Sequence, residues 1–353
     1  MTVDNYGALG LFNQQKEEQC VKSKTVAAVV FGLISGICHA SSGLFTVLAT
    51  SRQLSEFQII FVSALIGTLF SFLVIKLRRL KLLIDDRLTT IILFVNAGTM
   101  FFGDSAYVFA VQLVPLGDTT AIINGCLPFL TALLSCVILK ESLRVTDGVC
   151  SILNICGILL ITCPSFIFDS RSGGPSNMLV GYGLTITSAV CYSLSPVLIR
   201  KVKDTNIFVV TFYHWTINSL LSCLMMFLVG TSNWQLSAET AGYLIAVVSF
   251  DILEVCLLYR GVQMEGAITI VLLANIDVVI MYIFDHFVLN KNIHVLEIIG
   301  ATMIVVSSVV VAIMSSFFTV SRPCKQQSSD EECVNIERIT EPTMTEKHKL
   351  VND

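Results

Sequence analysis

Long runs of apolar residues alternate with short polar segments along most of the chain. A helix of about 20 apolar residues crosses the roughly 30 Å hydrocarbon layer of a bilayer. Ten runs qualify, the fifth of them on the short side: 25–50, 57–75, 89–114, 119–139, 148–164, 178–199, 207–230, 240–259, 266–289 and 298–318. They are too long for membrane-spanning strands and do not alternate in polarity. The expected fold class is an all-α polytopic membrane protein with ten transmembrane helices.

Lysine and arginine are distributed unevenly over the segments between these runs. With the N-terminus placed in the cytoplasm, 19 of the 22 basic residues fall on the cytoplasmic side, and only Arg52, Arg171 and Lys291 fall on the other. Basic residues accumulate in the cytoplasmic loops of membrane proteins. We therefore expect both termini in the cytoplasm, as an even number of spans requires. The sequence leaves open whether the membrane is the plasma membrane or an endomembrane.

Composition agrees with a membrane protein and narrows the function classes. Hydrophobic residues make up 54% of the chain and charged residues 14%, against about 25% charged residues in soluble domains. A net charge of −4 argues against a nucleic-acid binder. The 12 cysteines form no C-x-x-C pair and no zinc spacing, and no H-E-x-x-H or G-x-S-x-G motif occurs. We expect no metal, no cofactor and no enzymatic activity.

The two halves of the chain are related in sequence. Residues 36–43 in the first run match 189–196 in the sixth, and 117–141 run parallel to 266–291. Five spans in each half make the second half enter the membrane inverted, an architecture of secondary transporters. The expected organisation is a cytoplasmic N-terminal segment (1–24), a first repeat (25–165), a linker (166–177), a second repeat (178–318) and a cytoplasmic tail (319–353), whose polar composition predicts disorder.

Several short motifs resemble those of a known family. They are Gly-Asp-Thr-Thr-Ala-Ile at 117–122, Leu-Pro at 127–128, Leu-Lys-Glu at 139–141, Gln-Met-Glu-Gly-Ala at 263–267 and Asp-Val-Val at 277–279. Over residues 25–318 the sequence resembles the drug/metabolite transporter superfamily, EamA type, and is most similar to solute carrier family 35, subgroup G. This resemblance implies a helical bundle with an alternating-access cavity.

Ionisable and amide side chains inside the predicted spans are the candidate pathway residues. Such groups are costly in hydrocarbon, so they usually face a cavity. Burial disfavours the charged form of a carboxylate, which suits proton binding and release. The candidates for a substrate or proton pathway are Asp104, Asp251, Glu254, Asp277, His39, His214, Asn124 and Asn218. For His39, a plain hydrogen bond between helices is the alternative.

The predicted interior is acidic and holds no mid-membrane Lys or Arg. Phosphate carriers use such cations, so a neutral or cationic metabolite is favoured. We expect a secondary active transporter that moves a small organic metabolite by alternating access, with proton coupling as an option. The alternative is a regulatory or scaffolding membrane protein that acts through its tail and loops. The expected partners are the metabolite, the lipid bilayer and, as one option, a second copy of the chain.

Overall fold

The structure is a computed structural model that describes residues 3–114, 116–140, 145–168, 175–229, 234, 237–288 and 295–318. The chain divides into a compact unit, Thr25–Ser315, and a second unit that comprises Met1–Lys24 and Ser316–Asp353. The described backbone of the second unit is helical. The predicted tail at 319–353 and the central part of the predicted linker, 169–174, lie outside the described residues.

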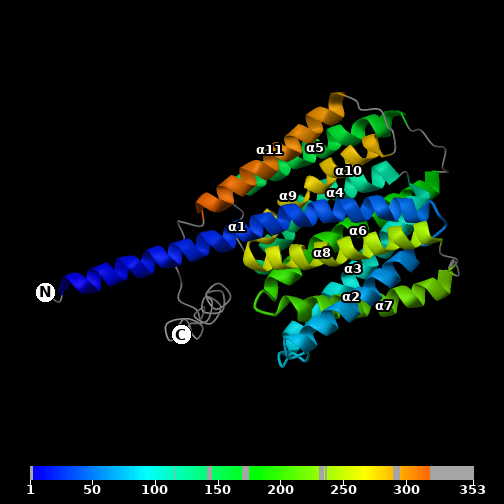
Figure 1. Cartoon of the computed structure of the whole chain (residues 1–353). Coiled ribbons are helices and arrows are strands. Elements are labelled where there is room, and N and C mark those ends of the chain that lie inside the picture. Colours follow the sequence, from blue (N-terminus) through cyan, green and yellow to red (C-terminus); the bar gives the residue numbers. More distant parts are fainter. Residues whose placement is uncertain are drawn as a thin grey trace, which may run out of the picture. The chain divides into compact units, whose positions relative to one another are not determined.

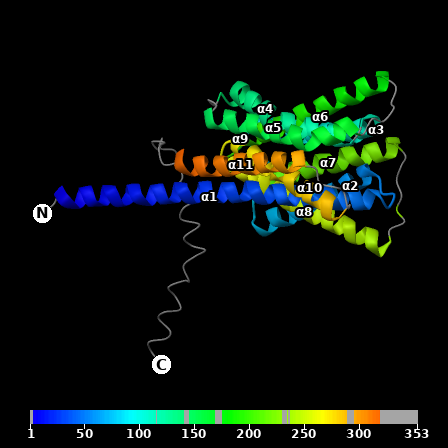
Figure 2. The ribbon, with the colours of Figure 1, turned by 90° about the horizontal axis from the view of Figure 1, so that it is seen from above.

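The described part of the chain is helical throughout its regular structure. Its elements are α1 (Val3–Thr50), α2 (Glu56–Leu77), α3 (Arg87–Leu113), α4 (Leu116–Leu134), the π-helix η1 (Ser135–Leu139), α5 (Val145–Phe168), α6 (Pro175–Lys201), α7 (Ile207–Val229), α8 (Ala238–Met264), α9 (Ala267–Ala274), α10 (Ile276–Phe287) and α11 (Val295–Phe318). Within Thr25–Ser315 these helices lie side by side along a common direction (Figures 1 and 2).

The ten predicted spans correspond to ten apolar helical segments. Eight of the described segments are long and apolar enough to cross a membrane, and α5 and α11 supply two shorter apolar stretches, Val145–Leu160 and Ile298–Met314. The boundaries differ from the prediction in two places. Helix α1 begins at Val3, well before the predicted start at residue 25, and the ninth span is interrupted at Asn275, where α9 ends and α10 begins. The all-α fold with two inverted repeats is confirmed.

Helices of one repeat pack chiefly against helices of the other. The main pairs are α3 with α6 and α2 with α7, and α4 also contacts α9. On the first repeat's α1, a stripe of small residues faces the second repeat: a Cβ at Gly36 would clash with the carbonyl oxygen of Ala274 and lie 2.7 Å from Ile276 Cγ2. The absence of a side chain at Gly36 therefore lets α1 lie against the break in the ninth span.

Polarity is distributed as expected for helices surrounded by lipid. Large apolar side chains such as Leu220 and Phe227 are 68% and 76% exposed on the outside, whereas Ser222, Asn154 and Thr211 are fully buried between helices. Lipid offers no hydrogen bonds, so polar groups must find partners inside the bundle. The bundle interior, where the two repeats meet, is therefore where a polar site can form.

Candidate functional site

His39 on α1 is the centre of the polar interior. Its Nδ1 lies 3.9 Å from Glu254 Oε1 on α8, and its Nε2 lies 3.7 Å from Asp277 Oδ2 on α10. The imidazole side chain is 57% exposed, while those of Glu254 and Asp277 are 17% and 11% exposed. His39 therefore borders open space and faces one carboxylate with each ring nitrogen.

Two further carboxylates complete an acidic cluster, which we define as Asp104, Asp251, Glu254 and Asp277 around His39. All four lie close enough to His39 to interact with it electrostatically. Asp251 is three residues before Glu254 on the same face of α8 and accepts a hydrogen bond from Ser42 Oγ on α1. Four carboxyl groups thus lie around one imidazole, so the acidic groups of the cluster outnumber the basic one.

Asp104 accepts a hydrogen bond from Tyr192, which the sequence did not single out as a candidate pathway residue. The hydroxyl of Tyr192 on α6 donates to Asp104 Oδ1 on α3 at 2.8 Å, and Ser188 Oγ donates to the carbonyl oxygen of Gly103 at 2.9 Å. A signal for Tyr192 was present in the internal repeat, because the match of 36–43 with 189–196 aligns it with His39.

The acidic cluster also carries the inverted symmetry of the chain. His39 and Tyr192 occupy equivalent repeat positions, and Asp104 and Glu254 lie 150 residues apart at the repeat offset. The α1–α8 contact of His39 with Glu254 therefore has its counterpart in the α6–α3 contact of Tyr192 with Asp104. Each contact joins the two repeats. The two contacts differ in length: His39 Nδ1 lies 3.9 Å from Glu254 Oε1, whereas the hydroxyl of Tyr192 lies 2.8 Å from Asp104 Oδ1.

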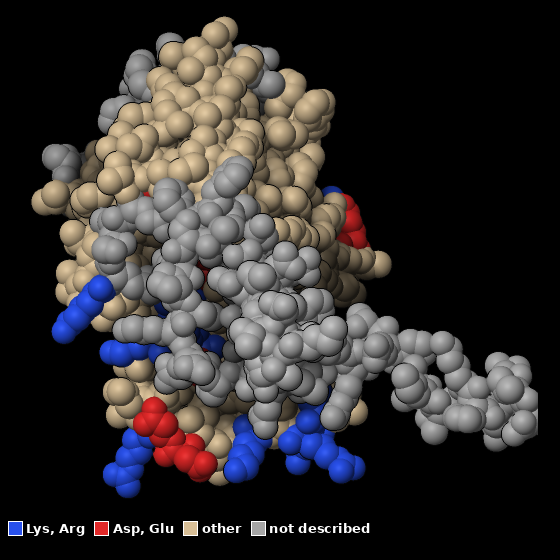
Figure 3. All heavy atoms as spheres, turned by 90° about the vertical axis from the view of Figure 1, so that its left-hand side faces the viewer, with Lys and Arg blue, Asp and Glu red and all other residues tan. Residues whose placement is uncertain are grey.

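These groups lie at mid-depth in the bundle. His39 is near the middle of Ser23–Thr50, Asp104 is in the middle third of Arg87–Leu113, and Asp251 is at the centre of Ala238–Met264. Basic residues occupy the ends instead. Figure 3 shows Lys and Arg side chains over the end of the molecule where α2, α6 and α8 finish. There, Arg200 donates to the carbonyl oxygen of Gln263 at 2.8 Å and so closes the C-terminal turn of α8.

The interruption of the ninth span is fixed by a buried amide network. Asn275 Nδ2 donates to Asn154 Oδ1 on α5 at 2.8 Å, and Asn154 Nδ2 donates to Ser307 Oγ on α11 at 3.2 Å. Ser308 Oγ donates to the carbonyl oxygen of Leu272 at 3.1 Å. Because Asp277 follows the break by two residues, these bonds also determine where its carboxylate lies.

His214 and Asn218 belong to a second buried network. His214 Nδ1 lies 3.2 Å from the hydroxyl of Tyr259, which also accepts a hydrogen bond from Asn96 Nδ2 at 3.3 Å. Asn218 Nδ2 donates to the carbonyl oxygen of His214 in its own helix. Tyr259 is close enough to Glu254 to interact with it electrostatically, so the second network borders the acidic cluster. Its role in transport stays a prediction.

Asn124, the remaining predicted pathway residue, lies on α4 and is half-buried. Among the described residues, no hydrogen bond or ion pair joins its side chain to the acidic cluster. The structure thus brings five of the eight predicted residues into one cluster, places two beside it, and leaves Asn124 apart.

Comparison with known proteins agrees with this architecture. The EamA-like transporter family matches the chain twice, over residues 26–163 and 179–313, which correspond to the two repeats. The chain belongs to the EamA-like transporter family. It is thus a multi-pass membrane protein of a transporter family, as the motifs at 117–122 and 139–141 indicated.

Two relatives from one solute carrier group are similar to the chain over part of its length. It is 26% identical to mouse solute carrier family 35 member G1 over 192 residues, which are 52% of this chain and 52% of that protein. It is 26% identical to the human protein of the same name over 219 residues, 61% of this chain and 60% of that protein. The matches thus span about half to three fifths of these relatives. A crystal structure of a protein 18% identical in sequence superposes with a TM-score of 0.66, covering 82% of this chain and 98% of that one. It supports the fold alone.

Proposed function

We propose that this EamA-family protein is a secondary active transporter that moves a small neutral or cationic metabolite by alternating access, and that protons drive the movement. Both termini lie in the cytoplasm in this proposal, since 19 of the 22 basic residues fall on the side of the membrane that carries the termini. The observation that supports transport by alternating access is the pair of repeat-related contacts at mid-depth between the two halves, His39 with Glu254 and Tyr192 with Asp104.

Alternating access needs contacts between the repeats that can be made and broken. Inverted repeats move as halves around a site near the bilayer midplane. Tyr192 and Asp104 are in hydrogen-bond contact, whereas His39 and Glu254 are at the edge of ion-pair distance. In the opposite-facing state, the two repeats exchange these arrangements: the α1–α8 contact tightens and the α6–α3 contact lengthens.

Proton coupling follows from the chemistry of the acidic cluster. Carboxylates close to one another and out of bulk water cannot all hold charge cheaply. A proton or a cationic substrate relieves the repulsion among Asp251, Glu254 and Asp277, and His39 can take up a proton between two of them. Phosphorylated metabolites are disfavoured by the same charges.

The scaffold alternative needs partners for the tail and loops. The tail lies outside the described residues. The hypothesis of a scaffolding protein also gives no role to the buried carboxylates, although burying them inside a membrane costs free energy.

Uptake into proteoliposomes tests this function. The purified chain is reconstituted and offered a panel of amines, amino acids and neutral sugars, and internal compounds are measured by mass spectrometry with and without an inward proton gradient. We expect at least one compound to accumulate and the gradient to increase its uptake. Glu254→Gln abolishes this increase, because the amide cannot take up a proton.

Glu239→Gln is the matched control. Glu239 carries the same side chain on the same helix, but it is 49% exposed and pairs with Arg52 at the surface at 2.8 Å. Its substitution should leave uptake intact. Uptake that is equal in wild type and Glu254→Gln, or no uptake of any panel compound by wild type, contradicts the proposal.

A further inference from the structure

We propose that the end of the bundle where α2 meets α3 and α6 meets α7 carries a binding site for an anionic phospholipid headgroup. The site consists of exposed basic residues, which we call the basic surface: Lys76, Arg78, Arg79, Lys81, Arg87, Lys201 and Lys203. This inference goes beyond the proposed transport function and does not depend on the acidic cluster.

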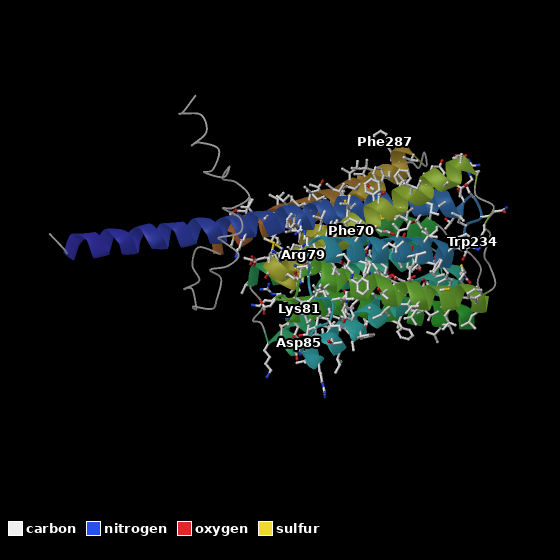
Figure 4. The ribbon with its side chains drawn as sticks, turned by 60° about the horizontal axis from the view of Figure 1, so that its bottom comes forward. Phe70, Arg79, Lys81, Asp85, Trp234 and Phe287 are labelled. Carbon is white, nitrogen blue, oxygen red and sulfur yellow. The ribbon has the colours of Figure 1, made fainter. Side chains whose placement is uncertain are left out.

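The two connections that carry the basic surface lie side by side. Helix α2 packs against α7, and the guanidinium of Arg78, just after α2, lies 5.1 Å from the ring centroid of Phe208 in the first turn of α7. Lys201 is the last residue of α6, and Lys203 lies in the short connection from α6 to α7. Figure 4 shows Arg79, Lys81 and Asp85 together at this end of the helices. Residues from distant parts of the sequence thus form one cationic patch.

The chain after α2 is held in a defined turn. Arg79 has a φ of 53°, in the left-handed region, and the backbone N–H of Leu80 donates to the carbonyl oxygen of Ile75 at 3.0 Å. This pair of features is a helix C-cap of the Schellman type. The turn sends the following segment, including Lys81, across the end of the bundle.

The cations of the basic surface are available to a ligand. No residue of this surface forms an ion pair with a carboxylate among the described residues. Three acids occur on the same connections: Asp85, Asp86 and Asp204. The carboxylate of Asp86 is already occupied, because it accepts hydrogen bonds from the backbone of Leu88 and from Thr89. The patch therefore keeps a net positive charge.

An apolar band beside the basic surface indicates that its ligand is a lipid. On α2, Leu69, Leu73 and Leu77 are 60%, 56% and 74% exposed, as expected for residues in contact with acyl chains. Lys76 lies at the end of this band with its ammonium 5.6 Å from the ring centroid of Phe72. A phospholipid whose tails lie along α2 brings its phosphate to the level of Lys76 and Arg78. A soluble anion would make no use of the leucines.

The charge of the headgroup follows from electrostatics. Clusters of basic residues next to a transmembrane helix bind anionic lipids with about 1 kcal/mol for each Lys or Arg near the surface, which is about a fivefold change in affinity per charge. Phosphatidylserine is therefore expected to bind more tightly than phosphatidylcholine, which has no net charge.

A direct binding experiment tests the site without any transported substrate. The full chain in neutral detergent is titrated with a fluorescent short-chain phosphatidylserine, and the dissociation constant is measured for wild type and variants. We expect Lys81→Gln to weaken binding about fivefold, and the combined change of Lys76, Lys81 and Lys201 to Gln to weaken it on the order of 100-fold. Unchanged melting temperatures show that the exposed substitutions leave the fold intact.

Lys140→Gln is the matched control, since Lys140 is also exposed at this end of the bundle but follows α4 and η1, away from α2 and α7. It should bind phosphatidylserine as wild type does. The proposal is overturned if Lys140→Gln weakens binding as much as Lys81→Gln, or if phosphatidylcholine binds equally well. It is also overturned if inorganic phosphate displaces the lipid, because the site then belongs to a soluble anion. Binding that survives when transport fails separates this inference from the proposed function.

Discussion

Replacement of Asn154 by leucine tests whether the amide network fixes the interruption of the ninth span. Asn154 on α5 is fully buried, accepts from Asn275 Nδ2 and donates to Ser307 Oγ. Leucine has the same number and branching of side-chain heavy atoms but can make neither bond. Ser307 keeps a partner, because its hydroxyl also donates to the carbonyl oxygen of Ile304 at 2.8 Å. Asn275, which is 3% exposed, loses the acceptor of its amide.

The expected loss of stability combines two contributions. A hydrogen bond between membrane helices contributes about 0.6 kcal/mol on average, which applies to the bond with Ser307. A buried amide donor left without a partner costs about 1–3 kcal/mol, which applies to Asn275. Asn154→Leu should therefore destabilise the protein by about 2–4 kcal/mol.

A double-mutant cycle separates this network from simple packing. Unfolding in mixed micelles with increasing SDS gives the free energy of unfolding for Asn154→Leu, Asn275→Leu and the double variant. Since the double variant has neither amide left unpaired, it should lose about 1–2 kcal/mol less than the two single losses together. If the single losses add to within about 0.5 kcal/mol, the two residues are not coupled and the reasoning is wrong.

Two further predictions concern helix packing and a helix terminus. Gly36→Val should destabilise the protein by about 1–3 kcal/mol through its clash with the break in the ninth span; Gly98→Val, where a Cβ meets nothing within 4 Å, should cost far less in the same SDS unfolding assay. Hydrogen bonds from Thr89 and Leu88 lower the pKa of Asp86 below its ordinary 3.8, so its stabilisation is present above that pH and is lost as pH falls through the lower folded-state value. Asp86→Asn should therefore flatten the decline of thermal stability below about pH 4, and an unchanged decline contradicts this assignment.

The sequence alone determined the architecture. The length of each apolar run follows from the thickness of the bilayer, and the parity of five spans per repeat forces the inversion, so neither depends on packing details. The position of each acid within its span was also visible, because a charged residue in a long apolar run is conspicuous. Local spacing placed Asp251 and Glu254 on one face of α8.

Only the tertiary structure decided which of these groups meet. His39 contacts Glu254 and Asp277 from the other repeat, and helical periodicity carries no information about partners so far apart in sequence. For the same reason, the sequence could not show that His214, a candidate pathway residue like His39, lies in a separate network with Tyr259.

The break at Asn275 shows the limit most clearly. No glycine or proline interrupts α9 and α10, so the local sequence predicts one continuous helix there. The interruption depends on Asn154 of α5, which bonds Asn275, and on Ser308 of α11, which bonds the carbonyl oxygen of Leu272. It also depends on Gly36, which lets α1 lie against it. Hydrogen bonds and close contacts between distant segments form only once the helices have packed. For that reason the sequence determined where the helices run, while packing between the repeats determined the geometry of the site.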